Sequence, residues 1–243
     1  MKFFRRLRLQ QVRESRLFTY FLYALGEITL VVIGILIALR INNANADRKQ
    51  YAQETQMLQE VLADMRAAQV IIDSTKYYNQ ITLDCLERVI HSLDHDSAFS
   101  TDLHRCFYLL VNWQSPFLPF TAYENLKSKG IDLISNRTIK DAINQIYGAD
   151  LPLLVQDADR TEWVFLQAIS FPQYVKHIRK SVGGGEAYPN NFMAMKQDAE
   201  FRNWLSLLWD IRRNTLEMSS WSSHKLDRSI ALIEEELQRR KAL

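Results

Sequence analysis

The longest apolar run of the chain lies near its N-terminus, from Leu17 to Ile41. Its 25 residues include one acid, Glu27, and one base, Arg40. A helix of that length spans about 37 Å, and the hydrocarbon core of a bilayer needs about 20 apolar residues. A span that began after Glu27 would be only about 21 Å long, which is too short. The pattern therefore predicts a transmembrane helix over residues 17–41 that carries Glu27 into the membrane.

Apolar residues then recur every seven positions from Tyr51 to Ile72, with Leu58 and Met65 between them. Polar residues separate them, so the spacing predicts a long helix with one apolar seam, which ends near His95. The seam suits packing within the chain, and an intermolecular coiled coil is the alternative. The less apolar stretch, residues 73–80, is the expected place for a break.

Short helices with clear start and stop signals follow. A short helix is expected over 101–113, and the sequence QSPFLPF over 114–120 is expected to form a loop that caps the core or lines a groove. Thr121 and Glu124 form a capping-box pattern that starts a helix, and Gly130 is suited to ending it.

The next helix is expected to begin at Arg137, after a cap at Ser135 or Asn136. It runs toward residue 169, and its prolines predict a kink at Pro152 and a stop at Pro172.

The C-terminal part has the same helical character. An apolar stripe at three- and four-residue spacing covers residues 192–240, and the serines of 219–223 predict a break in it. Before it, SVGGGEAYPNN at 181–191 has no Lys-Ser or Lys-Thr after its glycines and no strand before them, so it is expected to be a surface loop and not a phosphate cradle. No convincing strand appears anywhere, and the predicted fold class is all-α.

Composition and charge add a location. The chain is 47% hydrophobic with only seven Gly and five Pro, which is typical of a helix-rich protein. Residues 1–41 carry seven basic and two acidic groups, so +5, whereas residues 42–243 carry 23 basic and 26 acidic groups, so −3. The basic N-terminal flank predicts a cytoplasmic segment 1–16, a span 17–41 and an extracytoplasmic helical domain 42–243. The acidic balance of that domain argues against nucleic acid as a partner.

Cleavage of the N-terminal segment as a signal peptide is the rival interpretation. Ala44-Asn45-Ala46 has the small-residue pattern of a cleavage site. The basic stretch and the apolar run are both longer than a signal peptide needs, so an uncleaved anchor is the preferred interpretation.

One face of the predicted span combines the acid with small residues, which let a second helix approach closely. Glu27 then serves helix pairing, or it reaches headgroup water. The candidate helix-packing residues are Ala24, Glu27, Val31, Gly34 and Ala38.

Two stretches of the chain resemble a known family. GEITLVVIGILIALRINN (26–43) and TAYENLKSKGIDLIS (121–135) are similar to the signature stretches of a family of uncharacterised bacterial membrane proteins, a domain of unknown function. The resemblance implies a single-pass protein of the bacterial inner (cytoplasmic) membrane with most of the chain in the periplasm, and it implies no activity. The motif residues are Gly26, Glu27, Asn42, Asn43, Tyr123, Glu124, Asn125, Leu126, Lys127 and Gly130.

Candidate chemistry is sparse. His91 and His95 are four residues apart on a predicted helix, but no third metal ligand is matched to them, so no metal or other cofactor is expected. Cys85 and Cys106 could form a disulfide in an oxidising compartment or remain buried thiols. No hydrolase, P-loop or dinucleotide motif appears, and no catalytic residue is assigned.

The sequence therefore predicts a non-enzymatic, membrane-anchored interaction or scaffold protein. Its expected partners are the lipid bilayer and another protein or a second copy of the chain. The alternative is an extracytoplasmic ligand-binding, sensor-like module that acts through a partner membrane protein. A metal enzyme that uses His91 and His95 is the third and least supported hypothesis.

Overall fold

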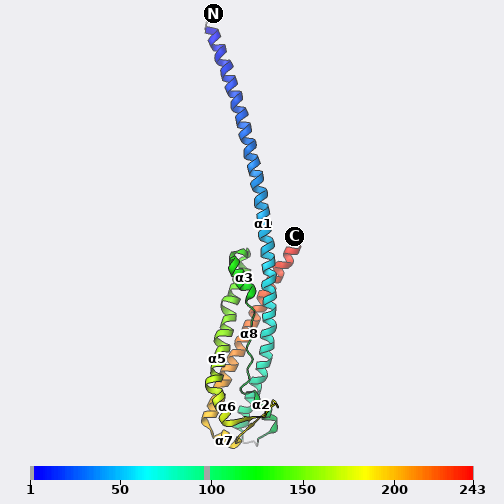
Figure 1. The fold of residues 1–243 in the computed structure, drawn as a ribbon, viewed down its shortest axis with the longest axis vertical. Helices are drawn as coiled ribbons and strands as arrows, with labels where there is room; N and C mark the ends of the chain where they lie inside the picture. The colour runs from blue at the N-terminus through cyan, green and yellow to red at the C-terminus, as the bar shows by residue number, and fades with distance from the viewer. Residues whose placement is uncertain (1–2, 96–98, 243) are drawn as a thin grey trace. The chain divides into compact units, whose positions relative to one another are not determined.

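The computed structural model describes residues 3–95 and 99–242, with side chains described from residue 21 onward (Figure 1). The chain forms two compact units, Met1–Gln53 and Glu54–Leu243. The structure is predominantly helical, in agreement with the all-α prediction. The elements are α1 (Phe3–Asp94), η1 (Thr101–Leu103), α2 (His104–Leu109), α3 (Thr121–Lys129), η2 (Ile131–Leu133), α4 (Arg137–Gln145), η3 (Ile146–Asp150), η4 (Leu153–Asp159), α5 (Arg160–Phe165), η5 (Leu166–Ser170), α6 (Phe171–His177), β1 (Ile178–Lys180), β2 (Ala187–Pro189), α7 (Phe192–Gln197) and α8 (Ala199–Lys241).

The first unit consists of the N-terminal half of α1. From residue 21 to residue 53 every side chain is exposed, including large apolar ones such as Leu30 (73%). This helix is long and apolar enough to cross a membrane by length and composition. These apolar side chains do not pack against the rest of the described chain, so their burial requires an apolar environment outside it.

The second unit is a helical bundle. The C-terminal half of α1, the helical arm from α4 to α6, and α8 lie side by side (Figure 1). The seam predicted on α1 packs within the chain, because Leu58, Met65 and Ile72 are each at most 1% exposed. One hydrophobic cluster joins these residues to α3, α4 and the end of α8, and a second cluster joins the end of α1 to α2, η5 and the start of α8.

The predicted break in α1 at residues 73–80 is wrong, because α1 is continuous to Asp94. The polar residues of this stretch find partners in the bundle. The buried Asn79 side chain donates to the Gln114 carbonyl at 2.9 Å and accepts from the Gln114 amide at 3.0 Å. This exchange fastens the QSPFLPF segment to α1. Leu118 and Phe120 of that segment pack on the core, as expected for a loop that covers it, whereas Phe117 is 86% exposed.

The arm passes through both prolines, so the predicted stop at Pro172 is wrong. A π-helical turn precedes each proline: η3 before Pro152 and η5 before Pro172. In each, the residue just before the proline donates its amide to the carbonyl five residues earlier (Leu151 to Ile146, Phe171 to Leu166). The wider turn accommodates a residue that has no amide hydrogen and would crowd the carbonyl four residues before it.

The start of α3 is correct, but its predicted capping box is wrong. Thr121 is already helical, and the cap residue Phe120 supplies no side-chain hydrogen bond. Instead Asp64 of α1 accepts a hydrogen bond from the Ala122 amide at 2.8 Å. Gly130 ends α3 with a positive φ of 97°, as its position predicts.

Two more expectations need correction. Helix α8 is continuous through 219–223, where Ser219, Ser222 and Ser223 are buried and Ser223 donates to Asp73 of α1 at 3.0 Å. A small antiparallel hairpin, β1 with β2, encloses the glycine loop, and Arg179 pairs with Tyr188. Gly183 and Gly185 have positive φ in its turn. The strands have three residues each, which is too short for alternation to reveal them.

Candidate functional site

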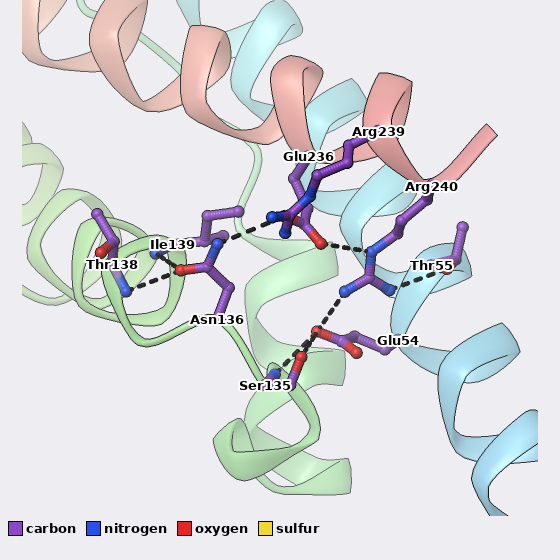
Figure 2. Close-up of polar contacts among 9 residues, drawn as sticks. All are labelled: Glu54, Thr55, Ser135, Asn136, Thr138, Ile139, Glu236, Arg239 and Arg240. Atoms are coloured by element: carbon purple, nitrogen blue, oxygen red, sulfur yellow. Dashed lines mark hydrogen bonds and ion pairs between the residues drawn. The ribbon is translucent and has the colours of Figure 1, made fainter. Parts of the chain in front are cut away.

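The bundle holds a buried network of charges where the chain enters it, which we call the Glu54 cluster (Figure 2). Glu54 of α1 accepts hydrogen bonds from the amide and the hydroxyl of Ser135, both at 2.8 Å, and pairs with Arg240 of α8 at 2.7 Å. The side chains of Glu54 and Arg240 are each only 4% exposed. A single carboxylate oxygen therefore holds the loop before α4 and the end of α8 against α1.

The network continues through a second acid. Arg240 also pairs with Glu236 at 2.8 Å and donates to Thr55 at 3.0 Å. Glu236, 7% exposed, accepts from Asn136 at 3.4 Å and from Arg239. Asn136 in turn caps α4 through its side-chain oxygen, which accepts from the amides of residues 138 and 139, as the cap prediction at 135 or 136 allows.

Ion pairs and hydrogen bonds favour the charged forms of Glu236 and Arg240. Burial raises the pKa of the Glu236 carboxyl, but hydrogen bonds from Arg240 and Asn136 outweigh burial and lower the pKa overall. Burial lowers the pKa of Arg240, and its bonds to Glu54 and Glu236 reverse this and raise it overall. With Arg239 included, two acids face two bases, so the cluster is neutral as a whole and each buried charge has a partner.

A second buried ion pair lies farther along the bundle. Arg212 of α8 and Glu162 of α5 are both 0% exposed and meet at 3.1 Å. Arg212 also donates to the carbonyls of Leu110 (2.8 Å) and Asn112 (3.2 Å). Its guanidinium lies 5.5 Å from the centre of the Trp113 ring.

This pair is incompletely satisfied. Nη1 of Arg212 and Oε2 of Glu162 are buried without a hydrogen-bond partner in the described part of the chain. Burial raises the pKa of Glu162, and Arg212 opposes that rise. Burial also raises the pKa of Asp159, whose carboxylate accepts from the Trp113 indole at 3.2 Å. The centre of the bundle is therefore a polar site with strongly desolvated acids.

His91 and His95, the only pair predicted as candidate metal ligands, contact each other. His91 and His95 stack with ring centroids 3.9 Å apart, and His95 Nδ1 lies 2.8 Å from the His91 carbonyl. Among the described residues no group of three or more His, Cys, Asp or Glu side chains could hold a metal. Cys85 and Cys106 are joined in a disulfide with Cα atoms 4.7 Å apart, which ties α1 to α2.

The motif residues of 121–130 have structural contacts. Tyr123 stacks on Tyr147 with centroids 4.9 Å apart, and Leu126 is fully buried. Lys127 pairs with Glu124 at 2.7 Å and lies 4.9 Å from the Tyr123 ring centre. Glu124 and Lys127 therefore lie on the exposed side of α3.

The helix-packing face predicted on the span is fully exposed in the first unit. It comprises Ala24, Glu27, Val31, Gly34 and Ala38. Nothing lies within 4 Å of a side chain built at Gly34 or at the motif glycine Gly26. Glu27 and the motif residues Asn42 and Asn43 are exposed as well, so this face remains a prediction.

Sequence reasoning missed Glu54, Arg240 and Glu162 as buried charges. Helical spacing does place Arg212 within the apolar stripe of α8. A charged residue on such a stripe is a signal that it is buried, and this signal could have identified Arg212.

No family model, curated protein or solved structure matches this chain. The fold and the site define only a broad class of protein. It is a helical protein whose N-terminal apolar helix could anchor it in a membrane and whose bundle is held by buried ion pairs.

Proposed function

We propose that this chain is a membrane-anchored interaction or scaffold protein of the bacterial inner membrane. Residues 1–16 lie in the cytoplasm, 17–41 span the bilayer, and 42–243 form a periplasmic helical domain. The observation that carries this proposal is the exposure of the apolar side chains from residue 21 to residue 41 on an unbroken helix. Lipid would cover them, and the basic N-terminal flank supports the orientation.

The bundle fits an interaction role because its polar groups serve structure. The Glu54 cluster holds α1, α4 and α8 together, and the motif charges pair with one another. We therefore assign no reaction to the chain. The resemblance to the family of bacterial membrane proteins rests on residues 26–43 and 121–135 and belongs to this proposal.

A ligand-binding, sensor-like role is the second candidate. The observation that favours it is the buried Arg212–Glu162 pair, which keeps one unpartnered polar atom on each side chain. A small polar ligand that satisfied both atoms would raise the stability of the bundle by mass action.

The test is purification of the full chain from native membranes in mild detergent. The interaction role predicts that the chain is recovered with a second protein or as an oligomer. Recovery as a monomer with no co-purifying protein would contradict it. In the same preparation, a small molecule that raises the melting temperature would support the sensor-like role instead.

A further inference from the structure

The outward side of the helical arm carries apolar side chains that no part of the described chain covers. We call this surface the arm face; it consists of Val164, Ala168, Phe171 and Val175. Val164 is 54% exposed, Phe171 36% and Val175 72%. The steps of four, three and four residues place them on one side of a helix. Such a stripe is typical of a surface that another helix covers.

The arm cannot turn this face inward, because its opposite side is already committed. Glu162, Leu166, Ser170 and Tyr174 are buried at four-residue steps, which the π-helical turn η5 makes possible. Ser170 accepts a hydrogen bond from the buried Trp204 indole of α8 at 2.9 Å. The arm is therefore fixed in rotation, and the arm face stays outside.

A groove of about 410 Å³ lies at the Val164 end of this face, where Val164 and Ala168 line it together with Ile211 of α8. Asp157 and Arg160 line one end of the groove, and both are exposed. Within the described residues neither side chain has an ion pair or a hydrogen bond.

We propose that the arm face docks a second copy of this chain. Two-fold pairing would place the apolar residues of one arm against the same residues of the other, because such an interface uses one patch twice. If the two arms run parallel, Arg160 of each chain would lie about one helical turn from the partner's Asp157. Because this end of the groove carries one acid and one base, the surface is complementary in charge to the same surface of a second copy. A purely anionic ligand such as a fatty acid would meet Asp157 as well as Arg160. This inference rests on the proposed interaction role and identifies a second copy of the chain as the partner.

Disulfide cross-linking of the full chain in membranes tests the surface. The chain's own cysteines are joined to each other, so one added cysteine reports alone. Val175→Cys is expected to yield a covalent dimer under mild oxidation. Val70→Cys is the matched control, because Val70 is similarly exposed (66% against 72%) but lies on α1. No dimer from Val175→Cys, or an equal yield from Val70→Cys, would overturn the proposal.

A charge exchange tests the pairing independently of the cysteine. Arg160→Asp places like charges at the groove end and is expected to weaken dimer formation by about two- to thirty-fold for two exposed pairs. Adding Asp157→Arg to that variant is expected to restore the dimer. A double variant as weak as the single one would reject the charge match. If the full chain co-purifies with another protein while Val175→Cys gives no dimer, the proposed function stands and docking on the arm face is rejected.

Discussion

Replacement of Arg240 by Met tests how much the Glu54 cluster contributes to stability. The change removes the partner of Glu54 at 2.7 Å and of Glu236 at 2.8 Å, and leaves both carboxylates less than 10% exposed. Breaking a buried pair by removing one partner costs about 3–5 kcal/mol, because the remaining charge stays desolvated. We expect about 3 kcal/mol, since Arg240 is in the last turn of α8 and that turn can fray to let water in.

Arg239→Met provides the matched control. The two arginines are neighbours on the last turn of α8, so both variants lose the same charge and the same interaction with the helix dipole. Arg239, however, is 67% exposed and among the described residues forms an ion pair with Glu236 alone, and exposed pairs contribute about 0–1 kcal/mol. The difference between the variants therefore isolates the effect of burial.

The assay is thermal unfolding of the full chain in detergent micelles, followed by tryptophan fluorescence. For a protein of this size Arg240→Met should lower the melting temperature by about 6–12 °C, and Arg239→Met by less than about 4 °C. Adding Glu54→Gln to Arg240→Met should recover part of the loss, because it removes one unpaired charge. Equal losses from the two arginine variants would refute the assignment of a buried network.

Three further predictions concern other polar sites. Arg212→Met should destabilise the bundle by about 3–5 kcal/mol in urea unfolding, and adding Glu162→Leu should recover most of that loss; no recovery would mean that the two residues act separately. Asp159 has a raised pKa in the folded state, so its contribution to stability is present below its unfolded pKa and is lost as pH rises through the folded pKa. Wild type should therefore lose stability relative to Asp159→Asn as pH rises above about 4, and an identical pH dependence of both proteins in urea unfolding would contradict this. In the span, Glu27→Gln should preserve association in membranes if the acid is neutral, whereas Glu27→Leu or Gly34→Leu should weaken it; unchanged cross-linking in all three would remove the pairing role.

Local signals were sufficient where a residue acts on its own backbone or on neighbouring turns. The seven-residue spacing of Leu58, Met65 and Ile72 predicts the seam that the bundle buries. Gly130 ends α3 because only a residue without a side chain adopts its positive φ easily. Asn136 caps α4 because its short amide reaches the first free amides of that helix. Each of these effects acts within a few residues, so the sequence alone reveals it.

Three of the wrong predictions fall where a distant residue decides the local outcome. The stretch 73–80 and the serines of 219–223 weaken a helix when considered alone, but in the bundle Asn79 bonds to the Gln114 backbone and Ser223 bonds to Asp73 of α1. The Thr121 capping box does not form, and Asp64 on another helix accepts from the Ala122 amide instead. Local propensity amounts to a few tenths of a kcal/mol per residue, and a buried hydrogen bond that would otherwise be lost exceeds it.

The sequence by itself determined a helical chain, an apolar segment long enough to span a bilayer, and an apolar seam that continues to Ile72. Only the tertiary structure decided which charges are buried. Glu54 and Arg240 come from opposite ends of the bundle's sequence, and Glu162 meets Arg212 across two helices. Whether a charged residue is solvated or desolvated depends on what packs around it, and helical periodicity carries no information about the partner on the next helix.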